Sequence, residues 1–350
     1  MQNKEIQAEI DFYSQKLKEA KMKEYKIINE RQKLSINVID NDINDIRALY
    51  CGDTVEILPT LKSNSVHYTL FSPPFSSLYV YSNSIRDMGN CKSDEEFYNH
   101  FKLIIPELYR VTMHGRLVSF HCMQIPAMKE RDGYIGLKDF RGDLIRLFQE
   151  VGFIFHSEVL VWKDPLLEVT RTKAHGLMHK QLCKDSAKCR NGLPDYIITM
   201  KKPGENPEPV SRDRGFEYYI GEKKNEPLNK KNDVPGLNKY SHNVFRTYAD
   251  PIWHDIRQTN TLNKKGAREE KDERHICPLQ LDTIARCIEY WTNTNDIVLS
   301  PFMGIGSEGY QAIAMNRRFI GIELKESYYK CAVKNITRVE TGHKQMDLFK

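Results

Sequence analysis

Residues 296–323 constrain the fold most strongly, because they show the order strand, glycine loop, helix and strand. Residues 297–299 and 319–322 have the apolar composition of short strands, and the intervening residues predict a helix. Gly304 and Gly306 permit a tight turn and a close approach of the backbone to a ligand. Glu323 follows the second strand, about 20 residues after the glycines, where Rossmann-type units bind ribose hydroxyls. The third glycine of pyrophosphate-binding loops is absent, so a nucleoside without a pyrophosphate fits better than NAD.

Residues 66–75 predict a buried strand that ends abruptly. Residues 66–71 are mostly β-branched, aromatic or apolar, whereas Pro73 and Pro74 lack N–H groups and fix φ. The Ser72 hydroxyl and the Pro73 carbonyl can both accept hydrogen bonds from one amino group, and Phe75 can stack on a planar ring. No general base is needed if the nucleophile is an exocyclic amine that loses its proton after attack. The structural alternative is a Pro-Pro loop with a core Phe.

The two motifs together resemble the amino-DNA methyltransferases that use S-adenosylmethionine (SAM), in their β-type order. In that family a Ser-Pro-Pro-Phe-like catalytic motif precedes an Asp-Pro-Phe-x-Gly-x-Gly cofactor motif, and here residues 72–75 precede residues 300–306. The resemblance is close over residues 47–79 and 275–335. It implies an α/β fold, with a Rossmann-like, mostly parallel sheet, helices on both faces and an inserted target-recognition region.

The resemblance also implies roles for individual residues. The catalytic group would be Ser72, Pro73, Pro74 and Phe75, and the cofactor-binding group would be Asp53, Cys277, Pro278, Ser300, Pro301, Phe302, Gly304, Gly306 and Glu323. Asp53 would meet the adenine amino group, although an Asp at this place is also an ordinary helix N-cap. Ser300 departs from the family, which usually has an acidic residue there. A serine brings no charge for the methionine ammonium.

The remaining apolar patterns extend the sheet. Further strands are expected at 48–51, 117–121, 154–162 and 196–200, and helices at 54–61, 94–111, 139–150 and 281–290. His121 ends one of these strands and should lie at the same edge as Ser72. We expect an N-terminal helical extension at 1–40, a catalytic half at 41–202, a target-recognition insert at 203–274, a SAM-binding half at 275–338 and a flexible tail at 339–350.

A basic segment lies between the last two strands of the catalytic half. Residues 163–190 contain seven Lys or Arg and three Asp or Glu, so they carry +4 of the net charge of +5. Because Lys and Arg at phosphates dominate DNA affinity, we expect phosphate contacts from Arg171, Lys173, Lys180, Lys184, Lys188 and Arg190. A zinc site formed by His175, His179, Cys183 and Cys189 is the alternative, but their spacing matches no standard zinc pattern. We expect no metal.

The chain shows no signal region and no run of membrane-span length, and its eight cysteines are typical of reduced thiols. We therefore expect a cytoplasmic protein, monomeric or dimeric, with double-stranded DNA and no membrane as its partner.

The last residues suggest a second partner. Gln345-Met346-Asp347-Leu348-Phe349 resembles the Gln-Leu-[Ser/Asp]-Leu-Phe motif by which bacterial replication proteins bind the sliding clamp. Docking of the tail on the protein's own surface is the alternative.

The resemblance implies methyl transfer from SAM to an exocyclic amine of a flipped base. The Ser-Pro-Pro form favours cytosine N4 over adenine N6. Two other hypotheses stay open: methylation of RNA or a protein glutamine, and a DNA-binding protein whose catalysis has decayed, which Ser300 supports.

Overall fold

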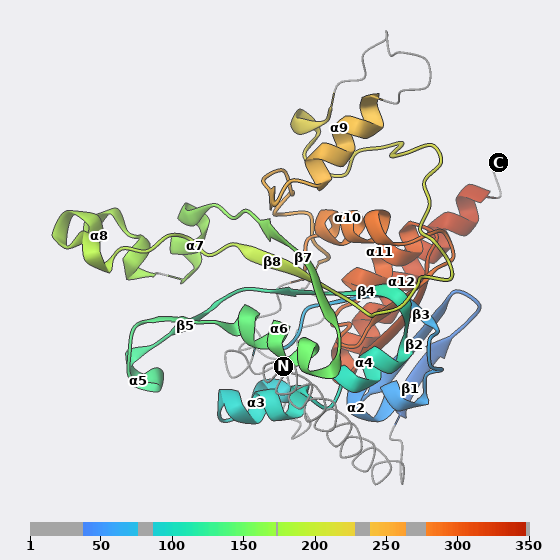
Figure 1. Cartoon of the computed structure of the whole chain (residues 1–350), viewed down its shortest axis with the longest axis horizontal. Coiled ribbons are helices and arrows are strands. Elements are labelled where there is room, and N and C mark those ends of the chain that lie inside the picture. The colour runs from blue at the N-terminus through green and yellow to red at the C-terminus, as the bar shows by residue number, and fades with distance from the viewer. Residues whose placement is uncertain (1–37, 76–86, 173, 228–238, 264–277, 348–350) are drawn as a thin grey trace, which may run out of the picture.

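The computed structural model describes residues 38–75, 87–172, 174–227, 239–263 and 278–347. A nine-stranded sheet, in the order β1-β2-β11-β10-β3-β4-β8-β7-β9, organises them (Figure 1). The strands are β1 (Val38–Ile43), β2 (Arg47–Gly52), β3 (Val66–Phe71), β4 (Thr112–Cys122), β7 (Ile154–Val161), β8 (Asp195–Lys201), β9 (Ile252–Trp253), β10 (Ile297–Ser300) and β11 (Arg318–Glu323). The predicted N-terminal extension lies outside the described residues, except that its last residues belong to β1 rather than to a helix.

The central strands β2, β11, β10, β3 and β4 are all parallel to one another. β1 and β8 pair antiparallel at the two sides of this group, and β7 pairs antiparallel with β8. The mostly parallel sheet is therefore confirmed. The carboxyl ends of the five central strands meet at one edge, where the start of β8 also lies.

Helices cover both faces of the sheet (Figure 1). The first face carries α2 (Thr54–Ile57), α3 (Asp94–Phe101), α4 (Ile105–Val111) and α6 (Phe140–Val151), and the second carries α9 (Lys239–Tyr248), α10 (Leu281–Trp291), α11 (Ser307–Ala314) and α12 (Glu326–Asp347). Neighbouring strand residues point to opposite faces, so Leu299 packs in the first core and Val298 in the second. This layering produces two hydrophobic cores separated by the sheet.

Two predicted helices and the predicted tail differ from the structure. The helix expected at 54–61 is shorter, because α2 ends at Ile57 and Leu58–Thr60 form a 3₁₀ helix. The helix expected at 94–111 is divided into α3 and α4, because Pro106 lies in the first turn of α4 and has no N–H to continue the preceding helix. α12 runs to Asp347 and takes the place of most of the flexible tail expected at 339–350. A glycine such as Gly342 costs only about 1 kcal/mol in a helix, so one does not end it. The sliding-clamp peptide thus lies partly in α12 and partly outside the described residues, and clamp binding stays a prediction.

Two arms project beyond the carboxyl edge of the sheet (Figure 1). One is a small hairpin, β5 (Ile125–Ala127) and β6 (Gly136–Lys138), with α5 (Lys129–Asp132) at its turn. It was not predicted. The other contains α7 (Pro165–Thr172) and α8 (His179–Lys184), and it corresponds to the basic segment.

Part of the expected target-recognition insert belongs to the body of the protein. β9 extends the sheet by pairing with β7. Phe216 packs against Tyr248 of α9 and Tyr290 of α10, with ring centroids 5.1 and 6.1 Å apart. The polar composition of this stretch hid these contacts, since they come from widely spaced aromatic residues.

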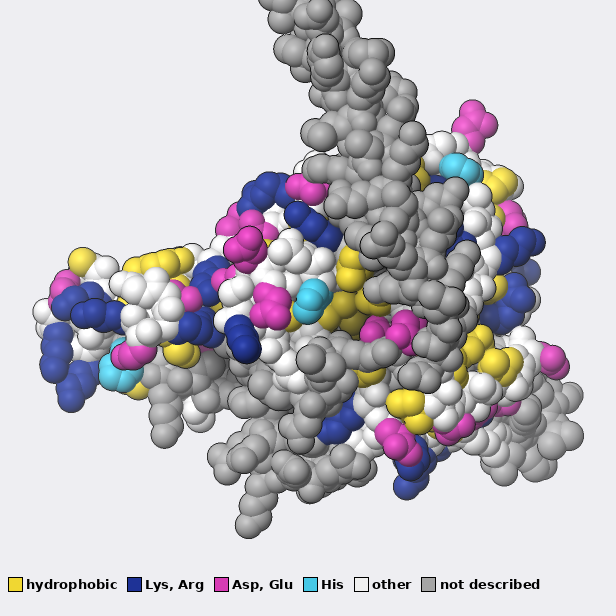
Figure 2. Space-filling model, turned by 90° about the horizontal axis from the view of Figure 1, so that it is seen from below, with side chains coloured by type: hydrophobic (Ala, Val, Ile, Leu, Met, Phe, Trp, Pro, Cys, Tyr) yellow, Lys and Arg dark blue, Asp and Glu magenta, His cyan; other side chains and the backbone are white. Residues whose placement is uncertain are grey.

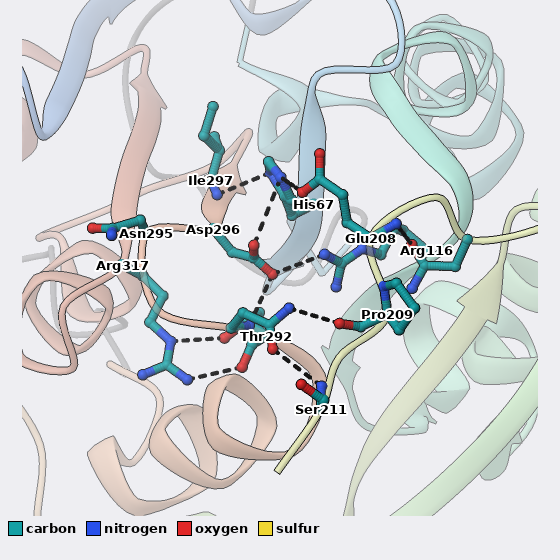
Figure 3. A network of polar contacts seen from close by, with 12 residues as sticks. His67, Arg116, Glu208, Pro209, Ser211, Thr292, Asn295, Asp296, Ile297 and Arg317 are labelled. Carbon is teal, nitrogen blue, oxygen red and sulfur yellow. Dashed lines mark hydrogen bonds and ion pairs between the residues drawn. The ribbon is translucent and has the colours of Figure 1, made fainter. Parts of the chain in front are cut away.

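A polar network at the opposite, amino edge ties this segment to the sheet (Figure 3). His67 Nδ1 accepts the Ile297 N–H at 3.1 Å, so the neutral ring carries its proton on Nε2. That nitrogen lies 3.1 Å from Glu208 and 3.6 Å from Asp296, which also pairs with buried Arg116 at 3.0 Å. The three groups have the proximity of metal ligands. A metal ion on Nε2 would need the ring proton on Nδ1, which already accepts the Ile297 N–H, so we interpret the network as a structural link between β3, β4, β10 and residues 206–211.

None of the helices in the described part of the chain is long and apolar enough to cross a membrane.

Candidate functional site

The two sequence motifs meet at the carboxyl edge of the sheet. β3 and β10 are adjacent, with Val298 opposite Tyr68, so Ser72 leaves the sheet two residues beyond the level of Ser300, beside the cofactor motif. The Thr54 hydroxyl donates to the Pro301 carbonyl and joins α2 to the cofactor motif. Segments from distant parts of the chain thereby form one edge.

Ser72 begins a chain of polar contacts. Its Oγ lies 3.0 Å from His121 Nδ1, at the end of β4. His121 Nε2 lies 3.0 Å from an oxygen of Asp195, and the other oxygen lies 2.5 Å from Lys163 Nζ. His121 was expected at this edge, whereas Asp195 and Lys163 were missed, because Asp195 is the first residue of an antiparallel strand and the sequence does not reveal that strand's neighbours.

The charge of Asp195 decides the tautomer of His121 and therefore the direction of the Ser72–His121 hydrogen bond. Burial opposes ionisation of Asp195, yet His121 and Lys163 lower the pKa of its carboxyl to about 2, so it is a carboxylate near neutral pH. A carboxylate beside Nε2 favours the tautomer with its proton there. His121 Nδ1 is then an acceptor, the Ser72 hydroxyl donates to it, and the Ser72 lone pairs remain to accept from another group.

The aromatic residues of the two motifs have different surroundings. Phe75 lies edge-on to His121 at 6.3 Å and contacts the Phe140 ring at 6.1 Å, half-buried beside Ser72. Phe302 packs in the first core, 5.9 Å from Phe71 and stacked on Phe101 at 6.3 Å. Phe302 therefore anchors the cofactor loop to the first core.

The glycine loop is held by Glu323. One carboxylate oxygen accepts the Gly304 N–H at 2.8 Å, and the other accepts the Lys325 N–H at 2.9 Å. Burial raises the pKa of Glu323 to about 7. Gly306 has φ +86°, and a Cβ there would lie 3.0 Å from Ala332 of α12. Gly304 has φ +53°, but no atom of the described residues lies within 4 Å of its Cβ position. Gly306 is therefore needed for the packing against α12, whereas Gly304 leaves room for a ligand.

Two of the other predicted cofactor residues, Asp53 and Pro278, are described by the structure, and Cys277 is not. Asp53 accepts the Val55 N–H at 2.9 Å and caps α2, as its alternative role predicts, and it lies at the end of β2 on the same edge. Pro278 precedes α10, whose first turn lies at this edge too, whereas Cys277 is outside the described residues.

The predicted DNA-binding residues lie on or near the second arm. Lys180, Lys184 and Lys188 are exposed, and Figure 2 shows Lys and Arg side chains gathered at the outer end of this arm. Arg190 instead donates to Glu168 at 2.7 Å and ties the base of the arm together. Arg171 belongs to α7, and Lys173 lies outside the described residues.

The four residues of the zinc alternative do not converge. His179 and Cys183 are 3.7 Å apart on α8, but within the described ranges they form no group of three ligand atoms with His175 or Cys189.

Comparison with known proteins identifies the family. A family model for DNA methylases, N6_N4_Mtase, matches residues 66–334. The orphan methyltransferase M.BamHII of Bacillus amyloliquefaciens is 23% identical over 293 residues, which cover 81% of this chain and 93% of that protein. TTHA0409 of Thermus thermophilus, solved with S-adenosyl-L-methionine, has a TM-score of 0.56 at 19% identity, over 84% of this chain and 95% of that one. The PvuII DNA methyltransferase, described as cytosine-N4-specific, has a TM-score of 0.54 at 15% identity, over 87% and 95%. The structural likenesses show the methyltransferase fold.

Because the family model spans well over half of the chain, the chain belongs to the N6_N4_Mtase family of DNA methylases. It is a DNA amino-methyltransferase, and SAM is its methyl donor. The residues at the edge fit this cofactor. Among the described residues nothing fills the space beside Gly304, Glu323 offers a carboxylate, and the buried Ser300 Oγ has no hydrogen-bond partner.

The two glycines predict separable effects. In Gly304→Ala the left-handed backbone costs about 1–2 kcal/mol, and the added methyl group enters the open space. We expect weakened binding of S-adenosylhomocysteine (SAH), the demethylated cofactor, with a small loss of stability. Gly306→Ala should lower the free energy of unfolding more, because its methyl group also meets α12. Urea unfolding and calorimetry with SAH measure the two effects, and unchanged SAH affinity in Gly304→Ala would contradict the assignment.

Proposed function

We propose that this protein methylates the exocyclic N4 amine of cytosine in duplex DNA at a specific sequence. The observation that carries this proposal is the contact of Ser72 with His121, 3.0 Å away, which leaves the motif with a neutral hydroxyl acceptor. The Ser-Pro-Pro form of the motif, typical of the N4 enzymes that the chain resembles, agrees with it.

In this proposal Ser72 and Pro73 orient the amine. The Ser72 hydroxyl donates a hydrogen bond to His121, so its lone pairs can accept a hydrogen bond from one amine N–H. The Pro73 carbonyl accepts a hydrogen bond from the other. These contacts direct the nitrogen lone pair toward the cofactor. SAM supplies an electrophilic methyl group when it is bound. Catalysis therefore rests on positioning and on local electrostatics.

The same contacts can receive the proton that the reaction releases. As the N–C bond forms and the S–C bond breaks, the amine nitrogen becomes positively charged and must lose one proton. Ser72 Oγ can take this proton while passing its own to His121 Nδ1. The imidazolium that results faces the Asp195 carboxylate at 3.0 Å, which stabilises it.

The target base must leave the duplex to reach this edge. In our proposal the Phe75 ring stacks on the extruded base, and the arm with α7 and α8 contacts the phosphates. The target-recognition role remains assigned to residues 203–274, as part of the same proposal.

The product tests the choice of base. DNA methylated by the purified protein is digested to nucleosides and analysed by mass spectrometry. We expect N4-methylcytosine, because the neutral Ser72 acceptor is typical of N4 enzymes. N6-methyladenine as the only modified nucleoside would reject the proposal, and modification of RNA in place of duplex DNA would favour the alternative substrate.

If the arm with α7 and α8 contacts phosphates, removing its charges should change the salt dependence of DNA binding. Lys180→Ala with Lys184→Ala removes two exposed charges one helical turn apart, so the slope of log K against log salt should fall by about 2. Lys330→Ala with Lys334→Ala is a matched control, since these lysines have the same spacing on α12, away from the arm. Filter binding to a duplex measures both. Equal slopes for the two double variants would contradict phosphate contacts by α8.

A further inference from the structure

A buried acidic side chain lies beside the glycine loop and has no assigned role. Glu308 is in the first turn of α11 and is only 5% exposed. Its carboxyl accepts a hydrogen bond from its own backbone N–H, so it is folded back over the start of the helix. Burial raises the pKa of Glu308 to about 8, and no charged group among the described residues contributes to this shift.

Several other buried carboxylates in the described ranges have a cation beside them. Asp195 contacts Lys163, Asp255 contacts Arg286, Asp282 contacts Arg257, Asp296 contacts Arg116, and Glu340 contacts Arg47. Burying an acid without such a partner is unfavourable. No cation of the described residues contributes to the pKa of Glu308, so a cationic ligand would supply the charge partner that the other acids have.

The position of Glu308 points to the source of that cation. β10 ends at Ser300 and α11 begins at Ser307, so Glu308 and Ser300 lie at the same carboxyl edge. α10 precedes β10 and must return to the amino edge, which leaves its start at this edge as well. Three buried oxygens there have no hydrogen-bond partner among the described residues: Ser300 Oγ, Gln280 Oε1 and Thr283 Oγ1. An acid and unsatisfied acceptors at the same edge suit an ammonium group, which offers three donors.

We propose that Glu308 supplies the negative charge that meets the methionine ammonium of SAM. The acidic group has moved from the end of β10, where Ser300 now stands, to the first turn of α11. The neutral Ser300 then accepts a hydrogen bond, and Glu308 balances the charge. This inference rests on SAM as the cofactor but not on which base is methylated. It also removes the reason to interpret Ser300 as a sign of decayed catalysis.

Equilibrium binding tests the proposal without catalysis. SAH and its analogue that lacks the amino group are titrated by calorimetry into the wild type and into Glu308→Gln. The wild type should prefer SAH over the analogue, because only SAH brings the ammonium. Glu308→Gln should lose about 10- to 100-fold in SAH affinity and bind the analogue as before.

Two further variants separate binding from folding. Ser300→Asp combined with Glu308→Gln should restore the preference for SAH, since it returns the charge to the end of β10. Glu340→Gln is the matched control, another buried glutamate, and should lower Tm while leaving SAH affinity unchanged. Ligand-free Glu308→Gln should melt no lower than the wild type, because it removes an unpaired buried acid.

Each other outcome is decisive. If the wild type binds SAH and Glu308→Gln keeps its preference for SAH over the analogue, Glu308 is only a buried structural acid and the proposal fails. If the wild type binds SAH and the analogue equally, no carboxylate meets the ammonium and the proposal also fails. If the wild type binds neither ligand, the use of SAM fails with it.

Discussion

The pairing of β3 with β10 is the contact on which the site depends. It joins strands about 230 residues apart in the chain, with Val298 opposite Tyr68 and Leu299 opposite Thr69. Both strands are buried on both faces, as parallel strands between two helical layers must be. The pairing sets the Pro-Pro motif beside the glycine loop, and neither motif can act without the other.

Much of this arrangement was predictable because it follows from local patterns. The apolar runs of β3, β10 and β11 and the two turn motifs predicted the parallel sheet and the edge where the site lies. Contacts between distant segments were not predictable. Asp195 reaches His121 only because β8 runs antiparallel beside β4, and the hairpin of β5 and β6 carries no strong strand pattern. The single Pro106 was enough to divide one predicted helix into two.

The carboxyl edge collects acidic groups under different electrostatic conditions. Asp195 is ionised because Lys163 and His121 stand beside it, whereas burial raises the pKa of Glu323 and Glu308. In our account the first holds the histidine that supports Ser72. The other two face the cofactor. Glu323 already accepts two backbone N–H groups, so it is Glu308 for which ligand binding supplies a charged partner. Burying Glu308 with no cation of the described residues beside it lowers the free energy of unfolding of the ligand-free protein, and it favours binding of a ligand that brings an ammonium group.

The central claim is that His121 acts on the reaction through Ser72. His121→Phe keeps the volume of the ring and its packing against Phe75 but removes the acceptor for the Ser72 hydroxyl. The most direct measurement is the single-turnover rate of methyl transfer to duplex DNA, with His156→Phe, on an exposed strand position, as the control. We predict that His121→Phe lowers the rate about 100-fold or more while SAH affinity stays close to the wild type, and that Tm falls because the buried Asp195 carboxylate loses its contact with His121. An unchanged rate in His121→Phe would contradict the account.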